Sequence, residues 1–150
     1  MRAFGASLIV SPAQVVDRAI ALAVAHRDDI VAVAGPDGLT ALVALCRQGF
    51  ERVECARQRT CRGAEELCDV LIVAGRQDPA ELSACLTRNA GLLREDGVLV
   101  VQLGRSQDDV VVREALARLG LEAASTVIDR ASGCLVIHRV RHRQALRAVG

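Results

Sequence analysis

The chain has 150 residues, of which 51% are apolar and 1% aromatic, and its formal net charge at pH 7 is +1. This length fits one domain, residues 1–150, with a core of Val, Leu, Ile and Ala. The small charge argues against a nucleic-acid surface, and no run reaches the roughly 18 apolar residues of a membrane span. The short apolar start lacks a signal-peptide pattern, so we expect a cytoplasmic protein.

A helix is expected at about residues 12–27. Ser11 suits the N-cap, Pro12 suits the first helical position, and Gln14 completes a capping box. Apolar residues then recur with helical spacing at Val15, Val16, Ala19, Ile20, Ala23 and Val24.

The stretch from Ile30 to Gly49 reads as a strand, a turn and a helix. Residues 30–34 are all apolar, which is typical of a strand covered on both faces. The turn Gly35-Pro36-Asp37-Gly38 can bring backbone N–H groups at a helix start close to a ligand. The helix, about residues 39–48, is expected to end at Gly49 and to bury Leu39, Leu42, Val43 and Cys46.

A short, charged strand is expected at about residues 52–56, and its charges favour a position at or next to a sheet edge. Such an edge still allows a two-fold homodimer. The next apolar strand, residues 70–74, follows after a connection too short for a crossover helix and another strand. A third strand between the two is therefore expected to be reduced or missing.

The second half of the chain continues the alternation of helices and strands. Asp78-Pro79-Ala80-Glu81 repeats the helix-start pattern seen at Ser11. We expect a helix to about Leu93, weakened by Gly91, then a turn at Asp96-Gly97 and a strand over residues 98–103. The next helix is expected to be capped by Ser106 with Asp109, to end at Gly120 and to bury Val112, Ala115, Leu116 and Leu119. An antiparallel hairpin of residues 121–128 and 134–140 follows, and the basic tail over residues 141–150 is expected to fray.

This order predicts an open, mostly parallel α/β sheet with helices on both faces and a C-terminal antiparallel hairpin. Right-handed crossovers place the ends of strands 30–34 and 70–74 side by side, where such sheets bind ligands. A small ligand is therefore expected to contact Gly35, Asp37 and Gly38, with Ala74 and Gly75 forming the opposite wall. Asp37 can alternatively serve as a helix cap, which we favour.

Six cysteines occur, at positions 46, 55, 61, 68, 85 and 134. They form no CxxC pair of the kind found in zinc sites, and they fall largely in the expected helices and strands. We expect six free thiols that pack as small apolar side chains, and no bound metal.

The chain resembles the class I S-adenosylmethionine-dependent methyltransferase family, whose fold is Rossmann-like. The resemblance covers about residues 30–141. It rests on Val31-Ala-Val-Ala-Gly35-Pro-Asp-Gly38, which looks like the family's glycine-rich first motif; on Leu92-Leu-Arg-Glu-Asp-Gly97-Val-Leu-Val-Val101, which looks like its LLxPGGxLVV segment; and on the final hairpin. It implies that S-adenosylmethionine would lie across the ends of the first, second and fourth strands.

The sequence departs from the family pattern where the cofactor would bind. Val33 stands where the family has an acid, and the GxGxG motif is reduced to Gly35 and Gly38. Ala56 or Arg57 stands where a carboxylate would accept hydrogen bonds from both ribose hydroxyls, so Arg57 joins the candidate cofactor contacts. The three His residues are scattered and no catalytic motif occurs, so no catalytic residue is identified.

Three functions stay open. The lost site residues favour a divergent methyltransferase-like domain without methyltransferase activity that serves as an interaction or regulatory module. The fold supports an active S-adenosylmethionine-dependent methyltransferase acting on a small molecule. The glycine turn also fits another nucleotide-binding α/β domain. S-adenosylmethionine is expected to bind weakly or not at all, and the sequence names neither a substrate nor a protein partner.

Overall fold

The computed structural model describes residues 11–56, 67–104 and 108–142. A seven-stranded sheet in the order β2-β1-β3-β4-β7-β5, with β6 paired to β7, forms its centre. The elements are α2 (Pro12–Ala23), β1 (Val31–Ala34), α3 (Gly38–Arg47), β2 (Val53–Cys55), β3 (Cys68–Val73), α5 (Pro79–Asn89), η1 (Ala90–Leu92), β4 (Leu93–Gln102), α6 (Asp108–Arg118), β5 (Leu121–Glu122), β6 (Ser125–Asp129) and β7 (Cys134–His142).

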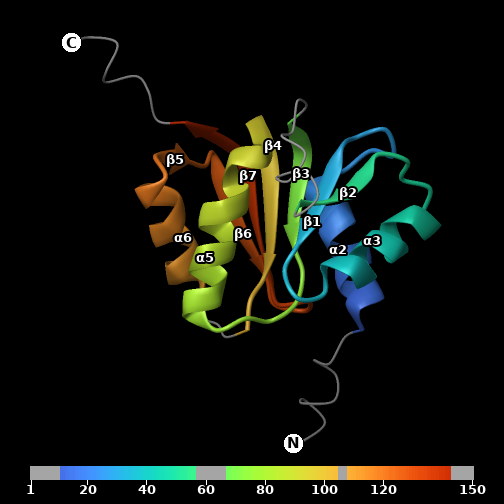
Figure 1. The fold of residues 1–150 in the computed structure, drawn as a ribbon, viewed down its shortest axis with the longest axis horizontal. Coiled ribbons are helices and arrows are strands. Elements are labelled where there is room, and N and C mark those ends of the chain that lie inside the picture. Colours follow the sequence, from blue (N-terminus) through green and yellow to red (C-terminus); the bar gives the residue numbers. More distant parts are fainter. Residues whose placement is uncertain (1–10, 57–66, 105–107, 143–150) are drawn as a thin grey trace, which may run out of the picture.

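Helices cover both faces of the sheet (Figure 1). Helices α2 and α3 pack with Val31 and Val33 of β1, whereas α5 and α6 share the other core with Ala32 and Ala34. Alternate residues of one strand therefore enter different cores, and every position must be apolar. This explains why β1 and most of β3 read as unbroken apolar runs.

The strand pairing confirms the predicted topology. Strands β2, β1, β3 and β4 are parallel, and β7 runs antiparallel to both β4 and β6. Strand β2 is terminal in the described sheet, as its charged, short sequence predicted. Residues 57–66, where the third strand was expected to be reduced or missing, lie outside the described residues. The carboxyl ends of β1 and β3 lie side by side, which places the switch point as expected.

Several element boundaries differ from the sequence-based expectation. Helix α2 ends at Ala23 rather than near residue 27, because Val24 adopts a left-handed conformation with φ 55° and its N–H bonds back to the Ala21 carbonyl. Helix α5 gives way to the short η1 turn after Asn89. The turn expected at Asp96-Gly97 was wrong: both residues lie inside β4, where Asp96 has φ 65° and the register with β3 shifts.

The predicted buried stripe of α3 was wrong at three of its four positions, and only Leu42 packs, partly buried, against the core. Gly38, Ala41 and Leu45 face the sheet, while Cys46 is exposed and Leu39 and Val43 are 67% and 43% exposed. Apolar residues surround this helix almost completely, so their spacing alone could not select the buried face.

The C-terminal region follows the predicted hairpin with two changes. The strand expected over residues 121–128 is divided into β5 and β6, and Arg141 and His142 belong to β7 rather than to a frayed tail. Residues 143–150 and the predicted cap Ser106 lie outside the described residues. Among the helices that the structure describes, none is long and apolar enough to cross a membrane.

An ion pair fastens α2 to the hairpin. The Arg18 guanidinium donates to both carboxylate oxygens of Asp129 at 3.0 and 2.9 Å, and the buried Ser132 hydroxyl donates to the same carboxylate at 2.6 Å. The hydrogen bond from Arg18, supported by Ser132, lowers the pKa of Asp129 to about 2. Side chains 111 residues apart are thereby joined.

We expect Asp129→Asn to lower the free energy of unfolding at pH 7 and to have a much smaller effect at pH 2. A carboxylate with a lowered folded-state pKa stabilises the fold above its unfolded pKa of about 3.9 and loses this contribution as the pH falls through about 2. Urea denaturation at the two pH values measures the difference. Arg141→Gln is the control, because its pair with Asp96 is half-exposed on both sides and should contribute little. Equal destabilisation by Asp129→Asn at both pH values would contradict this account.

Candidate functional site

The loop after β1 packs directly on the end of β3. Gly35 has φ +91°, and a Cβ at this position would lie 2.3 Å from the Ala74 carbonyl oxygen. The Asp37 N–H donates to that same oxygen at 3.0 Å, and the Ala74 N–H donates to the Ala34 carbonyl at 2.8 Å. Only glycine fits this approach, so Gly35 has a structural reason to stand here.

Gly75 extends this contact to the neighbouring strand. Its N–H donates to the Gln102 side-chain oxygen at 2.8 Å, and a Cβ on it would lie 2.9 Å from the Asp37 nitrogen. The ends of β1 and β3 are therefore held together by backbone contacts, and the Gln102 side chain joins the end of β4 to them. Ala74 and Gly75 touch the glycine turn instead of standing across a crevice from it, which corrects the expected geometry.

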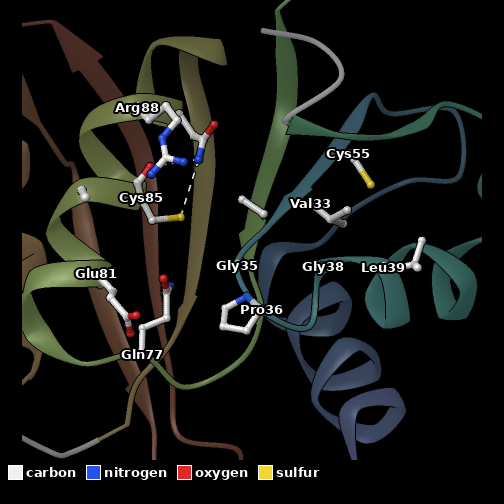
Figure 2. Close-up of a pocket in the computed structure, with 13 residues that line it drawn as sticks. Val33, Gly35, Pro36, Gly38, Leu39, Cys55, Gln77, Glu81, Cys85 and Arg88 are labelled. Carbon is white, nitrogen blue, oxygen red and sulfur yellow. Dashed lines mark hydrogen bonds between the residues drawn. The ribbon is translucent and has the colours of Figure 1, made fainter. Parts of the chain in front are cut away.

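A cavity of about 700 Å³ opens at the carboxyl ends of β1 and β2 (Figure 2). This volume lies in the range of small-molecule pockets. One side of the cavity consists of Val33, Ala34, Gly35, Pro36, Gly38, Leu39 and Cys55. The other side consists of Gln77, Glu81, Ala84, Cys85, Arg88 and Asn89, from α5 and the residues before it.

The sequence-predicted site residues divide into three groups. Gly35 and Gly38 line the cavity, as expected for ligand contacts. Asp37, Ala74 and Gly75 are not among its lining residues and hold the strand ends together instead. Arg57 lies outside the described residues. Which of these residues contacts a ligand stays a prediction.

Asp37 stands at the N-cap of α3 but its carboxylate accepts no capping hydrogen bond, so the cap that we favoured from sequence was wrong. Its backbone is committed to Ala74, and its φ of −102° and ψ of 21° depart from the extended geometry of capping residues. The first residues of α3, Gly38 and Leu39, therefore meet the cavity without a side-chain cap.

Helix α5 supplies the polar part of the cavity, and sequence reasoning missed it. A capping box fixes its start: the Glu81 N–H donates to Asp78 at 2.8 Å and the Asp78 N–H donates to Glu81 at 3.3 Å. The signal available in the sequence was the spacing that places Glu81 and Arg88 on one side of the helix, with Gln77 just before the N-cap Asp78.

Two groups on this side have unusual surroundings. The Gln77 Nε2 atom is buried and has no hydrogen-bond partner within the part of the chain that the structure describes. Asn89, which is buried, donates from Nδ2 to the Cys85 carbonyl at 2.9 Å and contacts the Cys85 Sγ at 3.5 Å, the bond drawn in Figure 2. The wall of the cavity thus contains a buried amide donor without a partner beside groups that are already satisfied.

The cysteines form no metal-binding centre among the described residues. Cys46, Cys55, Cys68, Cys85 and Cys134 are free thiols, and Cys61 lies outside the described residues. Burial raises the pKa of Cys134, which disfavours its thiolate. No group of three or more His, Cys, Asp or Glu side chains is placed to hold a metal ion within the ranges 11–56, 67–104 and 108–142.

Three glycine-to-alanine variants should separate backbone strain from steric contact at this junction. The added methyl group of Gly91→Ala has no atom within 4 Å, and Gly91 does not have a positive φ. Gly120 has a positive φ of +75° but open space around it, whereas Gly35 has both a positive φ and the Ala74 oxygen in the way of a Cβ. We expect urea denaturation to show little change for Gly91→Ala, a loss of about 1 kcal/mol for Gly120→Ala, and a clearly larger loss for Gly35→Ala. A Gly35→Ala variant as stable as Gly120→Ala would refute the close contact.

Comparison with known proteins was made by sequence and by structure. No protein-family model matches the chain, and a search of curated proteins finds no relative. Solved structures do match. The amino pentose methyltransferase CalS10 from Micromonospora echinaspora is 14% identical with a TM-score of 0.56, over 85% of this chain and 89% of that chain.

Two further structures give the same result. The ribosomal protein L11 methylase from Lactobacillus delbrueckii subsp. bulgaricus is 12% identical with a TM-score of 0.55, over 87% of this chain and 78% of that chain. An S-adenosylmethionine-dependent O-methyltransferase from Thermotoga maritima is 12% identical with a TM-score of 0.54, over 89% of this chain and 66% of that chain. The likeness is one of fold, and it confirms the resemblance read from the sequence: this chain has the Rossmann-like fold of class I S-adenosylmethionine-dependent methyltransferases.

Proposed function

We propose that this chain is a divergent methyltransferase-fold domain without methyl-transfer activity, serving as an interaction or regulatory module. The observation that carries this proposal is the chemistry at the end of β2. Cys55 is the residue of β2 that lines the cavity, and it is followed by Ala56 and Arg57, which stand where the family resemblance places the ribose-binding carboxylate. A thiol is a weak hydrogen-bond acceptor and cannot replace a carboxylate that binds two hydroxyls.

No nearby acid compensates on this strand. Glu54 is the only acidic residue between positions 53 and 64. It pairs in register with Ala32, one residue before the strand end, and it does not line the cavity. The residues at the end of β2 therefore do not fit the ribose of S-adenosylmethionine.

The glycine turn gives a second reason. In a GxGxG pattern that begins at Gly35, the second and third glycine positions hold Asp37 and Leu39. Leu39 lines the cavity and is 67% exposed, so a leucine side chain takes space that a glycine would leave open to a ligand.

Exposed apolar residues support an interaction role. Leu39 and Val43 line a second cavity of about 490 Å³ between α2 and α3, together with Ala13, Ala44 and the polar residues Asp17, Thr40, Arg47 and Gln48. Apolar side chains gathered at such a hollow are typical of protein contact surfaces. A homodimer or another protein partner would suit this surface or the open edge of β2.

The cavity itself favours a second candidate. Its position at the strand ends and its volume are those of a cofactor pocket in an open α/β sheet, so an active methyltransferase acting on a small molecule is the alternative. Another nucleotide-binding α/β domain is the third candidate, supported by the polar residues of α5.

A gain-of-binding variant tests the proposal. We expect the parent chain to show no binding of S-adenosylhomocysteine by isothermal titration calorimetry at millimolar concentration. Cys55→Asp should bind S-adenosylhomocysteine measurably, about tenfold or more tightly than the detection limit that the parent sets, because charged hydrogen bonds contribute about 1.5–3 kcal/mol each. Cys46→Asp is the control, since it places the same side chain on the exposed surface of α3. Circular dichroism would verify that both variants fold.

The opposite outcome is equally clear. Micromolar binding of S-adenosylhomocysteine by the parent would show that the cavity holds the cofactor without a carboxylate on β2, and the active methyltransferase would become the better account.

A further inference from the structure

We propose that the cavity at the ends of β1 and β2 binds a nucleoside 5′-phosphate along α5, through Gln77, Glu81 and Arg88. The inference rests on the proposed function in one respect: it takes the cavity as a regulatory ligand site and not as a methyl-transfer centre. Three features of the α5 side carry it, and each concerns a different part of the ligand.

The first feature is a buried donor without a partner. Gln77 lines the cavity, and its Nε2 atom is buried without a hydrogen bond in the described part of the chain. A buried donor left unpaired costs about 1–3 kcal/mol, so native structures rarely retain one without a reason. An acceptor atom on a ligand in the cavity would satisfy it.

The second feature is an acceptor beside this donor. Glu81 lies in the first turn of α5 and Gln77 lies just before its N-cap Asp78, and Figure 2 shows the two side chains next to each other at one end of the cavity. A carboxylate accepts hydrogen bonds only. A donor and an acceptor side by side match the Watson–Crick edge of a nucleobase, which presents an acceptor next to a donor.

The third feature is a cation at the other end. Arg88 lines the cavity, is exposed, and has no ion pair or hydrogen bond within residues 11–56, 67–104 and 108–142. It follows Glu81 by two helical turns, which is about 10 Å along the axis. A base and its 5′-phosphate are separated by a comparable length, and the planar guanidinium suits a phosphate group.

The surface between these ends is mostly apolar. Ala84 and Cys85 lie on α5 between Glu81 and Arg88, and Val33, Pro36 and Leu39 face them across the cavity (Figure 2). Such side chains can cover the faces of a base and a sugar without demanding further hydrogen bonds. The arrangement therefore matches an elongated ligand that is polar at both ends and anionic at the Arg88 end.

Calorimetric titration of the full chain tests the proposal with AMP, CMP, GMP and UMP, with the four matching nucleosides, and with inorganic phosphate. We expect at least one monophosphate to bind and its nucleoside to bind about tenfold or more weakly, because the nucleoside lacks the contact with Arg88. Arg88→Gln should reduce binding of the monophosphate to the level of the nucleoside. Gln77→Met, which keeps the side-chain length, should weaken nucleoside and monophosphate alike.

Arg130→Gln is the matched control, because it removes the same charge from the exposed hairpin loop, outside the cavity lining, and should leave affinity unchanged. The proposal is overturned if none of the four monophosphates binds at millimolar concentration, or if Arg88→Gln binds as the control does. Inorganic phosphate that binds as tightly as the best nucleotide would overturn the base contact.

The two proposals fail separately. Tight binding of S-adenosylhomocysteine would end the proposed loss of cofactor binding whatever the nucleotides do. If neither the nucleotides nor S-adenosylhomocysteine binds, the nucleotide proposal is refuted and the proposed function is not.

Discussion

Hydrogen bonds from the Asp37 N–H to the Ala74 carbonyl and from the Ala74 N–H to the Ala34 carbonyl hold the two central strand ends together, and Gly35 permits this close approach; the position of the cavity depends on it. Because the glycine turn lies on the end of β3, no space is left between them for a ligand. The open volume is displaced toward β2 and α5 instead. The methyltransferase fold is thus retained, while the cavity takes its polar side chains from α5 and the residues before it, a different set from the glycine turn and the β2 carboxylate.

Much of the fold could be predicted from the sequence because its signals are local. The apolar runs of β1 and β3 and the capping boxes at Ser11 and Asp78 placed elements that the structure confirms. The errors fall where local signals are weak or ambiguous. Helix α3 is apolar almost all round, so only packing on the sheet selects Ala41 and Leu45. Helix α2 ends with Val24 as its C-cap in a left-handed conformation, and the sequence has no glycine there to indicate it.

The candidate site was harder to predict because it is made by tertiary contacts. Sequence order placed Gly35 and Gly38 at the end of a central strand, and both line the cavity. It could not show that Gly75 is tied to Gln102 and Asp37, since such contacts depend on the distance between loops. The α5 side had a readable signal in the spacing of Glu81 and Arg88, but only the structure turns that side toward β1.

The central claim is that this fold no longer holds S-adenosylmethionine at its strand ends. The most direct measurement is a ¹H–¹⁵N correlation spectrum of the parent chain, with and without saturating S-adenosylhomocysteine. The account predicts that the amide signals of Gly35, Gly38 and Cys55, which line the cavity, keep their positions. Saturable shifts of these three signals at micromolar ligand would contradict it.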